Sequence, residues 1–317
     1  MSKVLVVLES GGASLTRASF EALTAAHALG ARVTVVVLGA DTAASAMAAA
    51  FCNVERVVRL EHSLLATYSV DGWIAALEPL IRAEAPSFVL FPHSYQARDF
   101  APALAVRFGQ MLVSDVVTIA EGPVFTRPVQ DGRLMARCRT TGAEPGFVSV
   151  QAGAFAAAVP GDVAAPIAVL VPELAASAIR TTASQPFRAK SVEVDLASAT
   201  RIVSVGRGIQ GQENLPLIEA LAQALHAELA ASRPVCDAGW VSADRQVGSS
   251  GQTVAPRLYL AVGISGATQH LQGMRGASCI VAINRDASAP IFEVADYGIV
   301  GDLFEVVPAI TQALRSA

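Results

Sequence analysis

The segment VGISGATQHL, residues 262–271, places glycines and hydrogen-bonding side chains directly behind an apolar run. Glycine lets a backbone approach a ligand closely, and serine, threonine and glutamine donate and accept hydrogen bonds. His270 is suited to a place near a ring that becomes anionic on reduction, and Arg233 can supply a fixed positive charge. A single histidine behind a strand is more often a structural residue whose hydrogen bonds are made within the protein. Whether His270 contacts a ligand must therefore be judged from the loops that neighbour it.

The stretch GRGIQGQEN, residues 206–214, also follows a strand-like run. Gly206, Gly208 and Gly211 give the spacing G-x-G-x-x-G ahead of a helix-like segment. This spacing is typical of a loop that binds pyrophosphate at a helix N-terminus. A plain tight turn explains the same glycines equally well.

A third apolar run ends in AINRD, residues 282–286. Asn284 and Asp286 are able to hydrogen-bond a ribose or an adenine edge, although both residue types are also common turn formers. Ligands of open α/β sheets bind beyond the carboxyl ends of strands, where neighbouring loops converge. The coincidence of three such loops favours a binding site.

No residue pattern in the chain predicts catalysis by the protein itself. We find no nucleophile beside a base, no paired carboxylates and no cluster of metal ligands in the sequence. The long segment 231–256 has little periodicity, and its apolar residues Val235, Trp240 and Val247 indicate that it is ordered. We therefore expect no catalytic residue and no metal, and we expect a cofactor to bring the chemistry.

The first half of the chain alternates strand-like and helix-like segments. This alternation is the signature of a largely parallel sheet covered on both faces, so the fold class is α/β. Beyond residue 112 several strand-like runs follow without helices, including PVFTRPV and FVSVQAGAF. The predicted strands are residues 3–9, 32–39, 54–60 and 87–92, and the predicted helices are 16–30, 41–51, 70–84 and 97–108.

A polar stretch without periodicity, residues 176–198, is typical of a connector between domains. We predict an N-terminal α/β domain over residues 1–190 and a second, smaller α/β domain over residues 191–317. The predicted strands of the second domain are 200–206, 256–263, 278–284 and 297–302, and its predicted helices are 213–229, one from 266 and one from 303.

Composition excludes several classes of protein. The net charge of −4 and the absence of clustered Lys and Arg argue against a nucleic-acid surface. The four cysteines form no C-x-x-C pair, which fits a reducing compartment. Mean hydropathy is +0.47, but prolines and acidic residues interrupt the apolar stretch 155–179. The N-terminus resembles no targeting signal, so we expect a cytoplasmic protein of bacterial type.

Three runs carry a resemblance to a known family: SRPVCDAGWVSADRQVG, GQTVAPRLYLAVGISGATQHLQGM and IVAINRDASAPIFEVADYGIVGDLFEVVPAITQAL. They resemble the C-terminal half of the alpha subunit of electron transfer flavoprotein, from about residue 200 to the end. The N-terminal half is similar more loosely, in SFEALTAAHALG and SDVVTI. The resemblance implies a doubly wound (Rossmann-like) FAD-binding domain over residues 191–317.

The resemblance also implies partners. Alpha subunits of this family form a heterodimer with a beta subunit. The heterodimer holds FAD mainly in the alpha subunit and an AMP in the beta subunit. They are electron carriers and not enzymes with substrate turnover. They take electrons from flavin dehydrogenases, such as the acyl-CoA dehydrogenases of fatty acid β-oxidation, and pass them to a membrane quinone oxidoreductase.

Family positions transfer onto this chain as expected FAD contacts. Arg233 falls where a guanidinium lies against the isoalloxazine, Gln269 near the ribityl chain and His270 near the pyrimidine carbonyl. Asn284 and Asp302 match the adenosine contacts. The full expected set is Arg207, Ser232, Arg233, Gln246, Val247, Gly248, Ser249, Ser250, Gly251, Gly263, Ser265, Gly266, Ala267, Thr268, Gln269, His270, Asn284, Asp302 and Leu303.

The chain departs from the family pattern in its QVGSSG segment, where the family usually has QVGQTG. Ser250 keeps the hydroxyl expected to reach flavin N5 but lacks the methyl group that limits threonine rotamers. We therefore expect FAD to bind with an altered potential. Two other functions stay open: an electron-bifurcating relative that uses NADH, and a nucleotide-binding protein that has lost redox activity.

Overall fold

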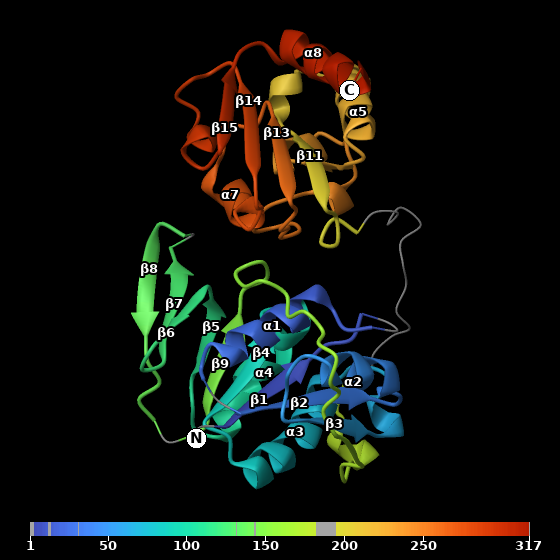
Figure 1. The fold of residues 1–317 in the computed structure, drawn as a ribbon, viewed down its shortest axis with the longest axis vertical. Helices are drawn as coiled ribbons and strands as arrows, with labels where there is room; N and C mark the ends of the chain where they lie inside the picture. Colours follow the sequence, from blue (N-terminus) through green and yellow to red (C-terminus); the bar gives the residue numbers. More distant parts are fainter. Residues whose placement is uncertain are drawn as a thin grey trace. The chain divides into compact units, whose positions relative to one another are not determined.

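The computed structural model describes residues 3–11, 14–30, 32–130, 132–142, 144–181 and 195–316. The chain divides into two compact units, Met1–Gln185 and Pro186–Ala317. The predicted domain boundary between residues 190 and 191 lies outside the described residues. Each unit is an α/β structure and is described by itself (Figure 1).

The first unit contains a seven-stranded sheet with the order β10-β3-β2-β1-β4-β9-β5, in which every pair is parallel. Parallel strands need crossover connections, and the predicted alternation supplies them as helices. The strands are β1 (Lys3–Leu8), β2 (Arg32–Gly39), β3 (Arg56–Glu61), β4 (Phe88–Pro92), β5 (Leu112–Val116), β9 (Gly146–Val150) and β10 (Ile167–Leu170). The helices are α1 (Arg17–His27), α2 (Ala43–Ala50), α3 (Val70–Glu84) and α4 (Tyr95–Arg107).

Helices cover both faces of this sheet. Alternate residues of β1 point to opposite sides, so Val4 and Val6 pack with α1 and α2, while Leu5 and Val7 pack with α3 and α4. Because the central strands are buried on both faces, they are nearly continuous runs of Val and Leu. The sequence therefore predicted β1–β4 and α1–α4 to within three residues at each end, whereas β5 and β10 were not assigned ranges.

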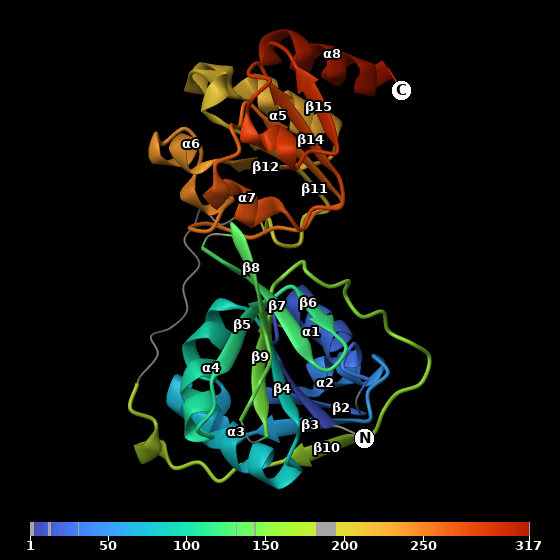
Figure 2. The same cartoon turned by 90° about the vertical axis from the view of Figure 1, so that its left-hand side faces the viewer.

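A separate three-stranded antiparallel sheet accounts for part of the chain beyond residue 112 (Figure 2). It consists of β6 (Thr118–Ala120), β7 (Val124–Val129) and β8 (Leu134–Cys138). The other strand-like run in that region, FVSV, forms β9 and joins the large sheet between β4 and β5.

Glu9, which directly follows β1, is a buried carboxyl group with 7% of its surface exposed. The Ser94 hydroxyl donates a hydrogen bond of 2.5 Å to it. Burial raises the pKa of Glu9 to about 7, against the lowering effect of the Ser94 and Ala97 hydrogen bonds. Because this value exceeds that of an unfolded glutamate, protonated Glu9 stabilises the fold in acid, and this stabilisation is lost as the pH rises through 7.

We expect Glu9→Gln to make the protein more stable than wild type at pH 8 but not at pH 5. Glutamine stays neutral, so the folded state no longer has to release a proton or bury a charge as the pH rises. The difference in free energy of unfolding should grow by about 2.5 kcal/mol between these two pH values. Urea unfolding of both proteins at pH 5 and at pH 8 measures this difference. A difference that is the same at the two pH values would show that Glu9 is not buried as described.

The second unit contains a five-stranded parallel sheet with the order β12-β11-β13-β14-β15. Four of its strands were predicted, whereas β12 was not. The prediction of one helix over 213–229 is wrong, because α5 ends at Ala224, His226 takes a left-handed φ of 49° and the chain then enters β12. The strands are β11 (Arg201–Val205), β12 (Glu228–Ala231), β13 (Leu258–Val262), β14 (Ile280–Asn284) and β15 (Tyr297–Val300).

Helices α5 (Leu215–Ala224) and α8 (Leu303–Ser316) cover one face of this sheet, and α7 (Thr268–Met274) packs on the other. The short helix α6 (Arg233–Asp237) follows β12. The chain runs from β11 to β12 on one side and returns to β13 on the other side. The loop after β11 leads to α5 on one face and the loop after β13 leads to α7 on the other. The two connections therefore diverge beyond their closely packed first residues, which leaves the crevice where doubly wound sheets bind ligands.

None of the helices among the described residues has both the length and the hydropathy to cross a bilayer.

Candidate functional site

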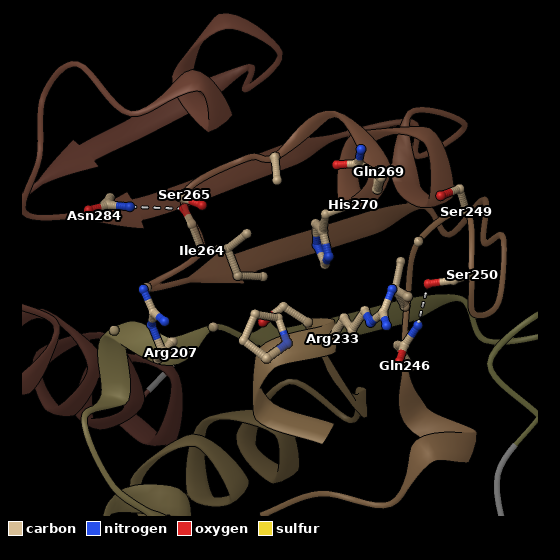
Figure 3. Close-up of a pocket in the computed structure, with 18 of the residues that line it drawn as sticks. Arg207, Arg233, Gln246, Ser249, Ser250, Ile264, Ser265, Gln269, His270 and Asn284 are labelled. Atoms are coloured by element: carbon tan, nitrogen blue, oxygen red, sulfur yellow. Dashed lines mark hydrogen bonds between the residues drawn. The ribbon is translucent and has the colours of Figure 1, made fainter. Parts of the chain in front are cut away.

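A cavity of about 630 Å³ lies at the carboxyl edge of the five-stranded sheet. Figure 3 shows side chains from four loops facing it, those that follow β11, β12, β13 and β14. This volume is in the range of pockets that bind small ligands and cofactors. The lining residues are Gly206, Arg207, Gly208, Ser232, Arg233, Pro234, Gln246, Val247, Gly248, Ser249, Ser250, Gly263, Ile264, Ser265, Ala267, Gln269, His270, Asn284 and Arg285.

Glycines allow the loops after β11 and β13 to pack against each other. A Cβ atom on Gly206 would lie 2.2 Å from the carbonyl oxygen of Gly263, and one on Gly208 would lie 2.8 Å from the Gly263 Cα. Gly263 itself has a φ of 63°, a left-handed conformation that favours glycine. Close packing of the two loops therefore requires glycine at Gly206 and Gly208, whether or not the loop binds a pyrophosphate. The 3-10 turns Arg207–Ile209 and Gln212–Asn214 lie between Gly206 and α5.

The cavity is electropositive. Arg207, Arg233 and Arg285 line it, and no Asp or Glu is among the described lining residues. Arg233 Nε lies 3.3 Å from the Asp237 carboxylate, one turn along α6, and both side chains are largely exposed. An exposed ion pair of this kind is weak, so the guanidinium remains able to contact an anionic ligand.

His270 is a buried, neutral member of the lining. Only 6% of its surface is exposed, and burial lowers its pKa to about 4, against a raising effect of the Val247 backbone. Its Nε2 atom lies 2.9 Å from the Tyr259 hydroxyl, while its buried Nδ1 atom has no hydrogen-bond partner. A buried polar atom without a partner is unfavourable unless a ligand supplies one. At neutral pH His270 can act on a ligand by hydrogen bonding and not by charge.

The loop over residues 246–252 forms a second wall. Ser249 donates its backbone N–H to the Gln269 carbonyl at 2.8 Å, which ties this loop to the start of α7. The Gln246 side chain donates to the Ser250 hydroxyl at 3.0 Å (Figure 3). Because Gln246 occupies the acceptor side of that hydroxyl, the Ser250 proton is free to point at a ligand.

The structure brings most of the predicted site residues to this one cavity. Fourteen of the nineteen expected contacts are among its lining residues. Asp302 and Leu303 line an adjoining cavity of about 50 Å³ together with Gly208, Asn284 and other residues. Gly251, Gly266 and Thr268 belong to the same loops but do not line either cavity.

Three side chains in the lining were missed: Pro234, Ile264 and Arg285. Each is the immediate neighbour of a residue that was predicted, so adjacency was the available signal. Asp286, considered for a ribose contact, accepts hydrogen bonds from the Ser288 backbone and hydroxyl, is exposed and lines neither cavity. Its role in the structure is that of a turn former.

The lining fits FAD. The cavity is large enough for a cofactor, three guanidinium groups can face a pyrophosphate or a ring that gains negative charge, and the unpartnered His270 nitrogen can meet a ring acceptor. Asn284 is held in place by donating to the Ile264 carbonyl at 2.9 Å, which leaves its side-chain oxygen facing the turn at Asp286. The described residues contain no group of three metal-ligating side chains.

Comparison with protein families gives two matches. Residues 195–275 match the "Electron transfer flavoprotein FAD-binding domain", and residues 4–209 match the "Electron transfer flavoprotein domain". The first match includes most of the residues that line the cavity.

Full-length relatives agree with these matches. The chain is 39% identical over 315 residues to the electron transfer flavoprotein subunit alpha of Paracoccus denitrificans, covering 98% of this chain and 99% of that protein. It is 36% identical over 317 residues to the protein of the same name from Mycobacterium leprae, covering 100% and 99%. With the Bacillus subtilis protein of that name, identity is 34% over 319 residues, covering 99% and 97%.

Proposed function

Because this chain belongs to the electron transfer flavoprotein family as an alpha subunit, we propose that it holds FAD in the cavity at the carboxyl edge of the five-stranded sheet and shuttles single electrons. The proposed donors are flavin dehydrogenases such as acyl-CoA dehydrogenases. The proposed acceptor is a membrane quinone oxidoreductase. We place this carrier in the bacterial cytoplasm.

The observation that carries the proposal is the composition of the cavity wall. Adenine-nucleotide binding alone needs no cation and no buried imidazole at the end of the pocket formed by α6 and the 246–252 loop. Arg233 at the start of α6, Ser250 in the 246–252 loop and His270 in α7 all line the cavity. That arrangement supports a redox ring more than it supports a nucleotide-binding protein without redox activity.

Bound FAD would supply the redox chemistry by accepting and releasing electrons. The residues of the chain bind and tune it. In this proposal the lining residues Arg207 and Arg285 would neutralise the pyrophosphate, Arg233 would stabilise negative charge on the ring, and His270 would donate a hydrogen bond to a ring acceptor. Asn284, Asp302 and Leu303 would hold the adenosine end.

The domain organisation belongs to the same proposal. The N-terminal domain, residues 1–190, would contact the beta subunit, and residues 191–317 would hold the flavin. Pairing with a beta subunit follows from the family, whereas an AMP in that partner is our expectation for this particular complex.

Removal of the Ser250 hydroxyl should lower the midpoint potential of the bound FAD. A neutral hydrogen bond contributes about 0.5–1 kcal/mol, which is roughly 20–40 mV for one electron. The midpoint potential of FAD bound to Ser250→Ala tests this prediction. Ser249→Ala is the matched control, since Ser249 lines the same wall but lacks the contact with Gln246. Equal shifts in the two variants would rule out a specific role for Ser250.

Electron transfer itself is tested with the chain co-produced with its beta subunit. We expect an acyl-CoA dehydrogenase with its substrate to reduce the bound flavin, and a membrane quinone oxidoreductase to reoxidise it. Rapid reduction by NADH would favour an electron-bifurcating relative. A complex that retains adenine nucleotide but cannot be loaded with FAD would favour a protein without redox activity.

A further inference from the structure

Tyr259 and His270 form a hydrogen-bonded pair beneath the cavity. Tyr259 lies in β13 and His270 in α7, and the Tyr259 hydroxyl is 2.9 Å from His270 Nε2. Tyr259 has no exposed surface, and both residues border a cluster of apolar side chains that includes Leu271 and Met274. A hydrogen bond in such a dry environment is stronger than one in water, so the pair is held in one geometry.

His270 presents its other nitrogen without a partner. Nδ1 is buried, makes no hydrogen bond within the chain and belongs to a residue that lines the cavity. A neutral imidazole carries one proton, and the partner of one ring nitrogen decides whether the other is a donor or an acceptor. The Tyr259 hydroxyl therefore controls what His270 offers to a ligand.

Two proton arrangements fit the Tyr259–His270 distance. If Nε2 donates to the phenol oxygen, the Tyr259 proton needs another buried acceptor. Ser204 on β11 is near enough to affect the pKa of Tyr259, but its hydroxyl makes no hydrogen bond, so this arrangement leaves a buried phenol proton unpaired. If the phenol donates to Nε2, both atoms are satisfied and the imidazole proton stays on Nδ1.

We propose that Tyr259 is a positioning residue that donates to Nε2 of His270 and thereby holds the imidazole proton on Nδ1, as a donor aimed at an acceptor atom of the bound cofactor. This inference rests on the proposed function for the identity of the acceptor. The tautomer itself is a property of the chain alone. The Val247 backbone raises the pKa of His270 but lies outside hydrogen-bonding geometry, so it leaves the Nδ1 proton available to a ligand.

The consequence for the cofactor follows from charge. A donor on Nδ1 stabilises a ring acceptor more when the ring is reduced and negative than when it is oxidised and neutral. An unprotonated Nδ1 would present a lone pair to the same atom and repel it. Loss of the Tyr259 hydroxyl should thus lower the preference of the site for reduced over oxidised FAD about tenfold, or about 59 mV for one electron.

The test uses the full chain labelled with ¹⁵N-histidine and assembled with its unlabelled beta subunit, first without flavin and then with FAD. His270→Gln identifies the His270 signals among the five histidines of the chain. Nitrogen chemical shifts distinguish the protonated from the unprotonated ring nitrogen. The variants are Tyr259→Phe, which removes only the hydroxyl, and Ser204→Ala, which removes a nearby hydroxyl outside the pair.

We expect the wild-type flavin-free complex to carry the proton on Nδ1, and Tyr259→Phe to populate the Nε2-protonated form and lower the flavin potential. Ser204→Ala should change neither. A wild-type proton on Nε2 overturns the proposal, and so does a Tyr259→Phe protein that keeps either the tautomer or the potential of wild type. If Tyr259→Phe does not fold, the position of the proton on His270 of the wild-type protein alone tests the proposal. Failure to take up FAD refutes the proposed function, while the flavin-free tautomer still confirms or refutes the proton placement.

Discussion

Gly206→Ala is expected to destabilise the second unit by about 3 kcal/mol and to abolish most FAD uptake. The new methyl group would lie 2.2 Å from the Gly263 carbonyl oxygen, and this neighbour is backbone that cannot rotate away. Either the loop after β11 or the loop after β13 must move. Both loops line the cavity, so the site should be distorted together with the fold.

Gly211→Ala is the matched control for this prediction. Both glycines belong to the same G-x-G-x-x-G pattern, and both have backbone angles that alanine adopts without strain. At Gly211 the closest atoms belong to the exposed Glu213 carboxylate, which can turn into solvent. We expect a change within about 0.5 kcal/mol there. Hydrogen-exchange rates of the β11 and β13 amides and the amount of bound FAD would be measured in both variants. Equal losses of protection and of FAD in the two variants would contradict the packing explanation.

Arg233→Ala is expected to lower the midpoint potential of bound FAD by roughly 80 mV for one electron while leaving most of the FAD bound. A unit positive charge at contact distance from a negative ring, in a partly desolvated wall, contributes about 2 kcal/mol, which converts to that shift. Among the described residues the guanidinium pairs only with the exposed Asp237 carboxylate, so its removal should leave the fold intact.

Two further variants separate charge from structure. Asp237→Asn removes the negative charge beside Arg233 and should raise the potential by a smaller amount. Arg275→Ala removes an exposed guanidinium that follows α7 and does not line the cavity, so the potential should stay unchanged. Spectroelectrochemical titration measures the midpoint potential of bound FAD in all three variants. A potential in Arg233→Ala equal to that of wild type would remove Arg233 from the ring environment.

Strands β1–β4 and helices α1–α4 of the first unit could be predicted because these strands are apolar runs rich in Val, Leu and Phe and each helix has an apolar stripe. Strand β12 could not. Its sequence ELAA continues the alanine-rich pattern of α5, and alanine favours helix. Only pairing of Glu228–Ala231 with β11, after the left-handed turn at His226, makes it a strand.

The candidate site was predictable to the level of its loops. Residues behind strand ends converge in any parallel sheet, so Arg233, His270 and Asn284 could be assigned to one site from the sequence and the resemblance. The neutral state of His270 and its bond to Tyr259 were not predictable, because they depend on how α7 packs on β13. The packing role of Gly206 was likewise visible only once Gly263 was in place.

The most direct test of the account is a crystal structure of the complex of this chain with its beta subunit, purified with its bound cofactor. We predict electron density for one FAD in the cavity of the second unit, with the ring between Arg233 and His270 and the pyrophosphate near the loops after β11 and β13. Density for an adenine nucleotide without a flavin ring, or a cavity filled by the side chains of this chain, would contradict the account.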